Sequence, residues 1–82
     1  MTPDQAETAI TEALGQVTPG SDIDALPADA DVRDTLELDS LDFLRFVEIL
    51  SERTAERIDE DDYPQLATIA SAIKFLTGRS AS

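Results

Sequence analysis

Residues 36–50 read LELDSLDFLRFVEIL, in which an acidic residue and a serine stand directly before an apolar stripe with helical spacing. We expect a helix from about Ser40 to Arg57. Its buried sector, at about 100° per residue, would hold Phe43, Phe46, Val47, Leu50 and Thr54. Asp39 directly precedes this helix and is well placed to cap it by accepting hydrogen bonds from N–H groups of the first turn.

A helix is also expected on either side of this segment. The first should begin at Pro3 with Thr2 as its cap and should end at Thr18-Pro19-Gly20. Its apolar stripe consists of Ala6, Ala9, Ile10, Ala13, Leu14 and Val17. The last should be capped by Thr68 and should end near Gly78. It would bury Ile69, Ala72, Ile73 and Leu76.

The segments between these helices follow no regular period. Residues 20–38 read as a long ordered loop, held to the core by Ile23, Leu26, Val32, Leu36 and Leu38. The acidic segment DEDDYP after Ile58 is expected to hold one helical turn before Leu66. Since no stretch alternates with a period of two, the sequence predicts an all-α four-helix bundle of three main helices and one short helix, with a long loop between the first two. Residues 1–78 would form a single domain, followed by a disordered tail over 79–82.

Composition removes several classes of function. The chain has no cysteine and no histidine, so the residues that most often build zinc sites and catalytic acid–base pairs are missing. Its net charge is −12, which disfavours nucleic acids and anionic membranes and favours partners with basic patches. Aspartates in the long loop suggest calcium, but the EF-hand glycine and terminal glutamate are missing at the required spacing. No catalytic residue and no metal site are therefore predicted.

The location of the protein is predicted from two absences. The N-terminal residues MTPDQAETAI have neither the basic residues nor the apolar run of a signal peptide, and no segment is long and apolar enough to span a bilayer. We expect a cytoplasmic monomer.

Ser40 allows two interpretations. It could simply belong to a helix start, since serine is common there. If it instead takes part in chemistry, another protein must activate it, because the chain contains no histidine to activate the hydroxyl. A phosphate ester at this position would lie at a helix N-terminus, where the dipole stabilises anions.

The outer face of the same helix also has two interpretations. Glu48, Glu52 and Glu56 recur every four residues and would place like charges along one ridge. The ridge is either a solvated face or a docking stripe for basic partners. In the second case Leu41 and Leu44 would add an apolar contact beside Ser40.

The segment LELDSLDFLRFVEIL resembles the attachment segment of acyl carrier proteins, which read D-S-L at the start of their second helix. The resemblance covers nearly the whole chain, including the isoleucine before the acidic short helix (RIDEDDYPQL) and the threonine-capped final helix (TIASAIKFL). It implies a 4′-phosphopantetheine arm on Ser40, installed by a phosphopantetheinyl transferase. Asp39 would help that enzyme to recognise the site. Partner enzymes that transfer or modify acyl groups would dock along Leu41, Asp42, Leu44, Arg45, Glu48 and Glu52.

The resemblance implies a freestanding, non-enzymatic carrier of acyl thioesters in fatty-acid, polyketide or specialised lipid biosynthesis. The chain departs from the family pattern at Glu37, where glycine is frequent, at Arg45, where many members have an acid, and at Glu48, where many have an apolar residue. These departures bear on the identity of the docking partners. Two alternatives remain open: an aminoacyl or peptidyl carrier, and an acidic helical interaction module with no prosthetic group.

Overall fold

The computed structural model describes residues 2–80, with side chains for residues 2–78. Three main helices are α1 (Pro3–Val17), α3 (Ser40–Thr54) and α4 (Ile69–Ser80). A short 3₁₀ helix, η2 (Glu60–Leu66), precedes α4, and the long connection between α1 and α3 contains η1 (Ile23–Ala25) and α2 (Val32–Thr35). The predicted all-α fold is confirmed.

Helix α1 begins where its sequence predicts. The Thr2 side chain accepts a hydrogen bond from the Gln5 N–H at 3.2 Å, and the Gln5 side chain accepts one from the Thr2 N–H at 3.0 Å. This reciprocal pair is a capping box, and Pro3 at the first helical position gives up no intrahelical bond. The apolar stripe buries Ala6, Ile10, Ala13 and Leu14, and leaves Ala9 and Val17 partly buried against the core.

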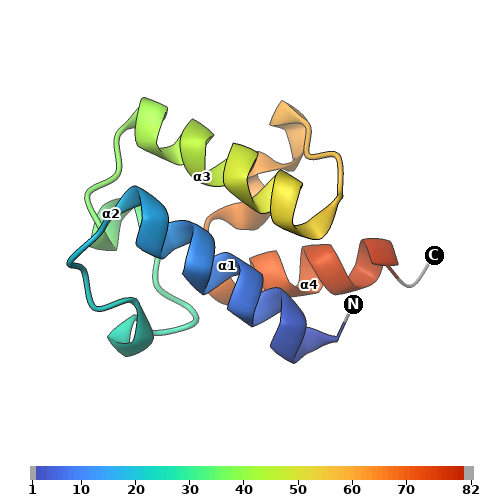
Figure 1. Ribbon diagram of the computed structural model, residues 1–82, viewed down its shortest axis with the longest axis horizontal. Helices are drawn as coiled ribbons and strands as arrows, with labels where there is room; N and C mark the ends of the chain where they lie inside the picture. The colour runs from blue at the N-terminus through green and yellow to red at the C-terminus, as the bar shows by residue number, and fades with distance from the viewer. Residues whose placement is uncertain (1, 81–82) are drawn as a thin grey trace.

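Helix α1 packs against both α3 and α4 (Figure 1). The predicted inner face of α3 is buried at Phe43, Phe46, Val47 and Leu50, while Thr54 is half-buried. The last helix buries Ile69, Ala72 and Leu76 as expected, with Ile73 partly buried. Phe75 is also buried, although the predicted stripe omitted it.

The loop between α1 and α3 is ordered and held to α4. The Val32 N–H donates to the Ala67 carbonyl and the Ala70 N–H donates to the Ala28 carbonyl, both at 2.9 Å. Val32 and Leu38 are buried, and Ile23, Leu26 and Leu36 pack against the core. The prediction that apolar side chains hold this loop to the core is confirmed, and backbone bonds to the start of α4 add to it.

Helix α3 ends earlier than predicted. Its last residue is Thr54, and Ala55 adopts a left-handed conformation with φ of 56°. The prediction that the helix extends to Arg57 is wrong because the backbone turns at Ala55, which the apolar spacing does not reveal. Glu56 therefore lies outside the helix and does not continue the ridge of Glu48 and Glu52.

Helix α4 begins after Thr68, whose hydroxyl oxygen accepts a hydrogen bond from the Ser71 N–H at 3.1 Å. The predicted cap is confirmed. The helix continues through Gly78 to Ser80, two residues further than its glycine suggested. The rest of the expected tail, residues 81–82, lies outside the described part.

Candidate functional site

Ser40 is the first residue of α3 and its side chain is exposed. Capping is performed by Asp39, whose Oδ1 accepts a hydrogen bond from the Asp42 N–H at 2.8 Å. Within residues 2–80, the Ser40 hydroxyl takes part in no hydrogen bond. Ser40 is therefore not the capping residue of this helix, and its oxygen is free for other chemistry.

The backbone before Ser40 is held by the end of α2. The Leu38 N–H donates to the Arg33 carbonyl at 2.9 Å, which is the long-range bond of a Schellman motif. The motif places Glu37 in the left-handed region with φ of 55°, where glycine is favoured. Leu38 is 7 % exposed and Phe43 is 5 % exposed, so a buried side chain on either side anchors the Asp39–Ser40 step.

A hollow of about 220 Å³ opens beside Ser40, between α2, the start of α3 and η2. We call it the Ser40 groove; its lining residues are Arg33, Ser40, Phe43, Leu44, Glu60 and Tyr63. The Phe43 ring forms its wall and meets Tyr63 edge-on, with ring centroids 5.7 Å apart. The groove is thus aromatic on one side and carries the free serine hydroxyl at its edge.

Arg33 lies over this aromatic wall. Its guanidinium carbon is 5.2 Å from the centroid of the Phe43 ring, within the range of a cation–π contact. The ion pairs among the described side chains involve Arg53 and Arg57, so Arg33 has no carboxylate partner there. The groove therefore presents an unpaired positive charge in a strongly acidic protein.

The outer side of α3 carries a second hollow, of about 440 Å³, which we call the outer hollow. Its lining comprises Gln16 of α1 and Leu41, Leu44, Arg45, Glu48, Ile49 and Glu52 of α3. Leu41 is 77 % exposed and Leu44 is 40 % exposed, which is unusual for large apolar side chains. Five of the six predicted docking residues meet here; Asp42 instead lies in the first turn of α3, half-buried.

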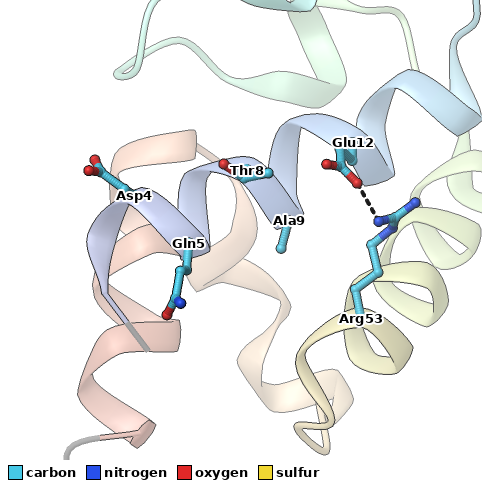
Figure 2. A pocket seen from close by; sticks show the side chains of 6 residues that line it. All are labelled: Asp4, Gln5, Thr8, Ala9, Glu12 and Arg53. Atoms are coloured by element: carbon cyan, nitrogen blue, oxygen red, sulfur yellow. Dashed lines mark hydrogen bonds and ion pairs between the residues drawn. The ribbon is translucent and has the colours of Figure 1, made fainter.

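A third hollow, of about 420 Å³, lies between α1 and the last turn of α3, and we call it the Arg53 cavity. Figure 2 shows its lining residues, with Arg53 extending from α3 towards Glu12 on α1. The two side chains form an ion pair. No sequence motif pointed to this cavity, and its remaining lining residues are Asp4, Gln5, Thr8 and Ala9.

Sequence reasoning missed two residues of the Ser40 groove, Arg33 and Tyr63. Both lie in segments without helical periodicity, seven residues before and 23 residues after the serine. The available signal was compositional: Arg33 is a lone basic residue in the acidic stretch DADVRDTLEL, and Tyr63 is the single tyrosine of the chain.

Two further findings concern residues 2–80. Residues 2–80 contain no group of three or more acidic side chains that could hold a metal ion. None of the helices in this range has both the length and the apolar character needed to cross a bilayer.

Comparison with known proteins identifies the family. Residues 8–76 match the family described as phosphopantetheine attachment site, which spans α1 to α4 and includes Ser40. No curated protein and no solved structure matches the chain significantly. The match covers most of the chain, and the prosthetic group of this family is covalently attached 4′-phosphopantetheine. The chain belongs to the phosphopantetheine attachment site family, whose members are carrier domains of the acyl carrier protein type.

Proposed function

We propose that Ser40 is the attachment residue and that the protein is an acyl carrier. The observation that carries this proposal is the exposed Ser40 hydroxyl, which has no hydrogen-bond partner within residues 2–80 and lies inside the family match. Because Asp39 already caps α3, esterification of Ser40 removes no interaction from the fold. The residues present therefore fit a group attached at this oxygen.

The prosthetic group supplies a terminal thiol, to which acyl groups are attached as thioesters. The chain's own residues have other tasks. The Schellman turn and buried Leu38 hold the attachment site at the surface, and the Asp39 cap stabilises the first turn of α3. We therefore assign the protein the role of a carrier and not of an enzyme, since the reactive thiol belongs to the prosthetic group.

Partner enzymes are proposed to dock on the outer hollow, beside Ser40. Exposed Leu41 and Leu44 offer apolar contact near the attachment site, and Glu48 and Glu52 offer negative charge further along the helix. Arg45 interrupts the acidic surface and has no ion-pair partner among the described side chains. Suitable partners therefore combine basic side chains with an acid opposite Arg45. A transferase that installs the arm is one required partner.

Attachment is tested by intact mass. Apo protein is incubated with coenzyme A, magnesium and a broad-specificity phosphopantetheinyl transferase. A mass gain of one phosphopantetheine is expected for the wild type and for Ser21→Ala, a control at another exposed serine. No gain is expected for Ser40→Ala. An equal gain in Ser40→Ala would contradict the proposal.

The class of cargo is tested separately, with protein that already carries the phosphopantetheine arm. We expect acylation by malonyl donors and none by aminoacyl donors, because LELDSL lacks the glycine-rich stretch usual in peptidyl carriers. Preferential loading of amino acids would instead support the aminoacyl alternative.

The acidic surface and the biosynthetic role favour a cytoplasmic monomer.

A further inference from the structure

We propose that the Ser40 groove holds the base of the prosthetic arm, with the phosphodiester against Arg33 and the dimethyl carbon of the pantoyl unit against Phe43 and Tyr63. This inference rests on the proposed attachment at Ser40. It adds a binding site for the arm on the protein's own surface, on the side of α3 that faces η2.

Charge favours a phosphodiester beside Arg33. In a chain with net charge −12, arginines have many possible carboxylate partners, and Arg53 and Arg57 each pair with one. Arg33 and Arg45 pair with none among the described side chains, and of these two only Arg33 lines the Ser40 groove, together with Glu60. A phosphodiester on Ser40 places a permanent negative charge at the edge of this groove, and a guanidinium is the side chain best suited to bind it.

Arg33 is held in place through both its backbone and its side chain. The Arg33 N–H donates to the Asp31 carboxylate at 2.9 Å, and its carbonyl accepts from Leu38 in the Schellman motif. Its guanidinium lies over the Phe43 ring. Backbone and side chain are therefore both positioned before the arm is attached, which lowers the entropic cost of the contact. Arg33 and Ser40 line one hollow of about 220 Å³, and we therefore place the anion on Ser40 beside the guanidinium.

The chemical groups at the base of the arm match the lining of the Ser40 groove. After the phosphate come a dimethyl carbon, a hydroxyl and an amide. Besides Arg33, Ser40 and Glu60, the lining of the groove consists of the apolar side chains Phe43 and Leu44 and half-buried Tyr63. The Tyr63 hydroxyl makes no hydrogen bond within residues 2–80 and is available to the pantoyl hydroxyl or amide.

A second hollow adjoins the Ser40 groove. An adjoining hollow of about 270 Å³ shares Arg33, Phe43 and Tyr63 with it and extends to Pro64 and Ala67. Leu44 lines both the Ser40 groove and the outer hollow, and therefore lies between them. The arm base and a docked partner would therefore occupy opposite sides of Leu44 and would not compete.

The direct test is NMR spectroscopy of the protein that carries the arm but no cargo. We expect nuclear Overhauser effects between the two pantoyl methyl groups and the ring protons of Phe43 and Tyr63. We also expect the methyl signals to be shifted by the rings relative to free pantetheine. Methyl signals at their free position, with no such effects, would overturn the proposal. Ring contacts that form only after acylation would show that the groove binds cargo, and would overturn it too.

The role of Arg33 is tested by thermal unfolding before and after attachment of the arm. In Arg33→Gln, the change in melting temperature on attachment should be about 2–4 °C less favourable than in the wild type, because the added negative charge is no longer paired. Arg57→Gln is the matched control, since it removes the same charge from an exposed arginine paired with Asp59. Equal changes in the wild type and Arg33→Gln would contradict the assignment of Arg33.

Each comparison is made between attached and unattached forms of the same variant, so an effect of the substitution on folding cancels. Tyr63→Phe keeps the ring and removes only the hydroxyl; it should retain the methyl contacts. The intact mass of every sample shows whether the arm is attached, so attachment at Ser40 and binding in the groove are tested separately. Failure to attach the arm would contradict the proposed function, whereas attachment without ring contacts would contradict only the groove.

Discussion

The two ends of α3 each carry a hollow and an arginine, but they differ in chemistry. At the C-terminal end, the Arg53 cavity is the larger, about 420 Å³, and its arginine is paired with Glu12 (Figure 2). At the N-terminal end, the Ser40 groove is about 220 Å³, and its arginine has no ion-pair partner among the described side chains. Volume alone does not single out the Ser40 groove.

The difference between the two ends is one of unused groups. The Ser40 groove combines a free hydroxyl, an unpaired cation and an aromatic wall, all supplied by residues held in place by caps and buried neighbours. The charged pair of the Arg53 cavity is satisfied within the protein, and Ala9 supplies its apolar surface. A site that will bind something keeps some of its polar groups unused, and the Ser40 groove has a hydroxyl and a guanidinium of this kind side by side with an aromatic wall.

The largest expected effect concerns the wall of the Ser40 groove. Phe43→Ala should lower the free energy of unfolding by about 3 kcal/mol, because it removes a buried ring that contacts both Phe46 and Tyr63. Thr8→Ala, at an exposed wall of the Arg53 cavity, should change it by less than about 0.5 kcal/mol. Urea unfolding measures both. Similar values for the two variants would show that the two ends do not differ in this way.

The next effect concerns the cap. Asp39→Ala should lower the free energy of unfolding by about 1 kcal/mol, because the Asp42 N–H loses its acceptor. Asp39→Asn is the matched control: it keeps a capping oxygen and removes the charge. Thermal unfolding should therefore show little loss in Asp39→Asn. Equal losses in both variants would mean that charge, and not the capping bond, stabilises this end.

A smaller effect is expected at two positions with left-handed backbone, Glu37 before α3 and Ala55 after it. Glu37→Gly and Ala55→Gly should each raise the free energy of unfolding by about 0.5–1 kcal/mol, because glycine adopts this conformation without a steric cost. Replacement by alanine at Glu37 is the control and should give no such gain. Destabilisation by glycine at either position would contradict the backbone described for that end.

The smallest effect belongs to the ion pair of the Arg53 cavity. Arg53→Gln should lower the free energy of unfolding by no more than about 0.5 kcal/mol, since the side chains of Arg53 and Glu12 are 36 % and 49 % exposed. A double-mutant cycle with Glu12→Gln isolates the coupling. A coupling energy well above this value would mean that the C-terminal end of α3 depends on its charged pair more than surface pairs do.

Much of the fold could be predicted because helical spacing and caps are local signals. The capping box at Thr2, the Asp39 cap and the buried stripes of α1 and α3 follow from residues within one or two turns of each other. The end of α3 could not be predicted, because Ala55 is a good helix former and nothing in its neighbours announces a left-handed turn.

The candidate site could be predicted only in part, because local signals reveal only those of its residues that are adjacent in the sequence. Asp39 and Ser40 are adjacent in sequence and are recognisable by their register at the helix start. Arg33 and Tyr63 reach the Ser40 groove through the Schellman turn and through the packing of η2, which are tertiary features. A reading along the chain finds the reactive residue more easily than the residues that surround it.

The most direct test of the central claim is to locate the modification by fragmenting peptides from the wild-type protein after treatment with coenzyme A, magnesium and a phosphopantetheinyl transferase. The account predicts one phosphopantetheine, on Ser40, at the N-terminal end of α3. Attachment at another serine or threonine, or no attachment by a transferase that modifies a positive-control carrier, would contradict it.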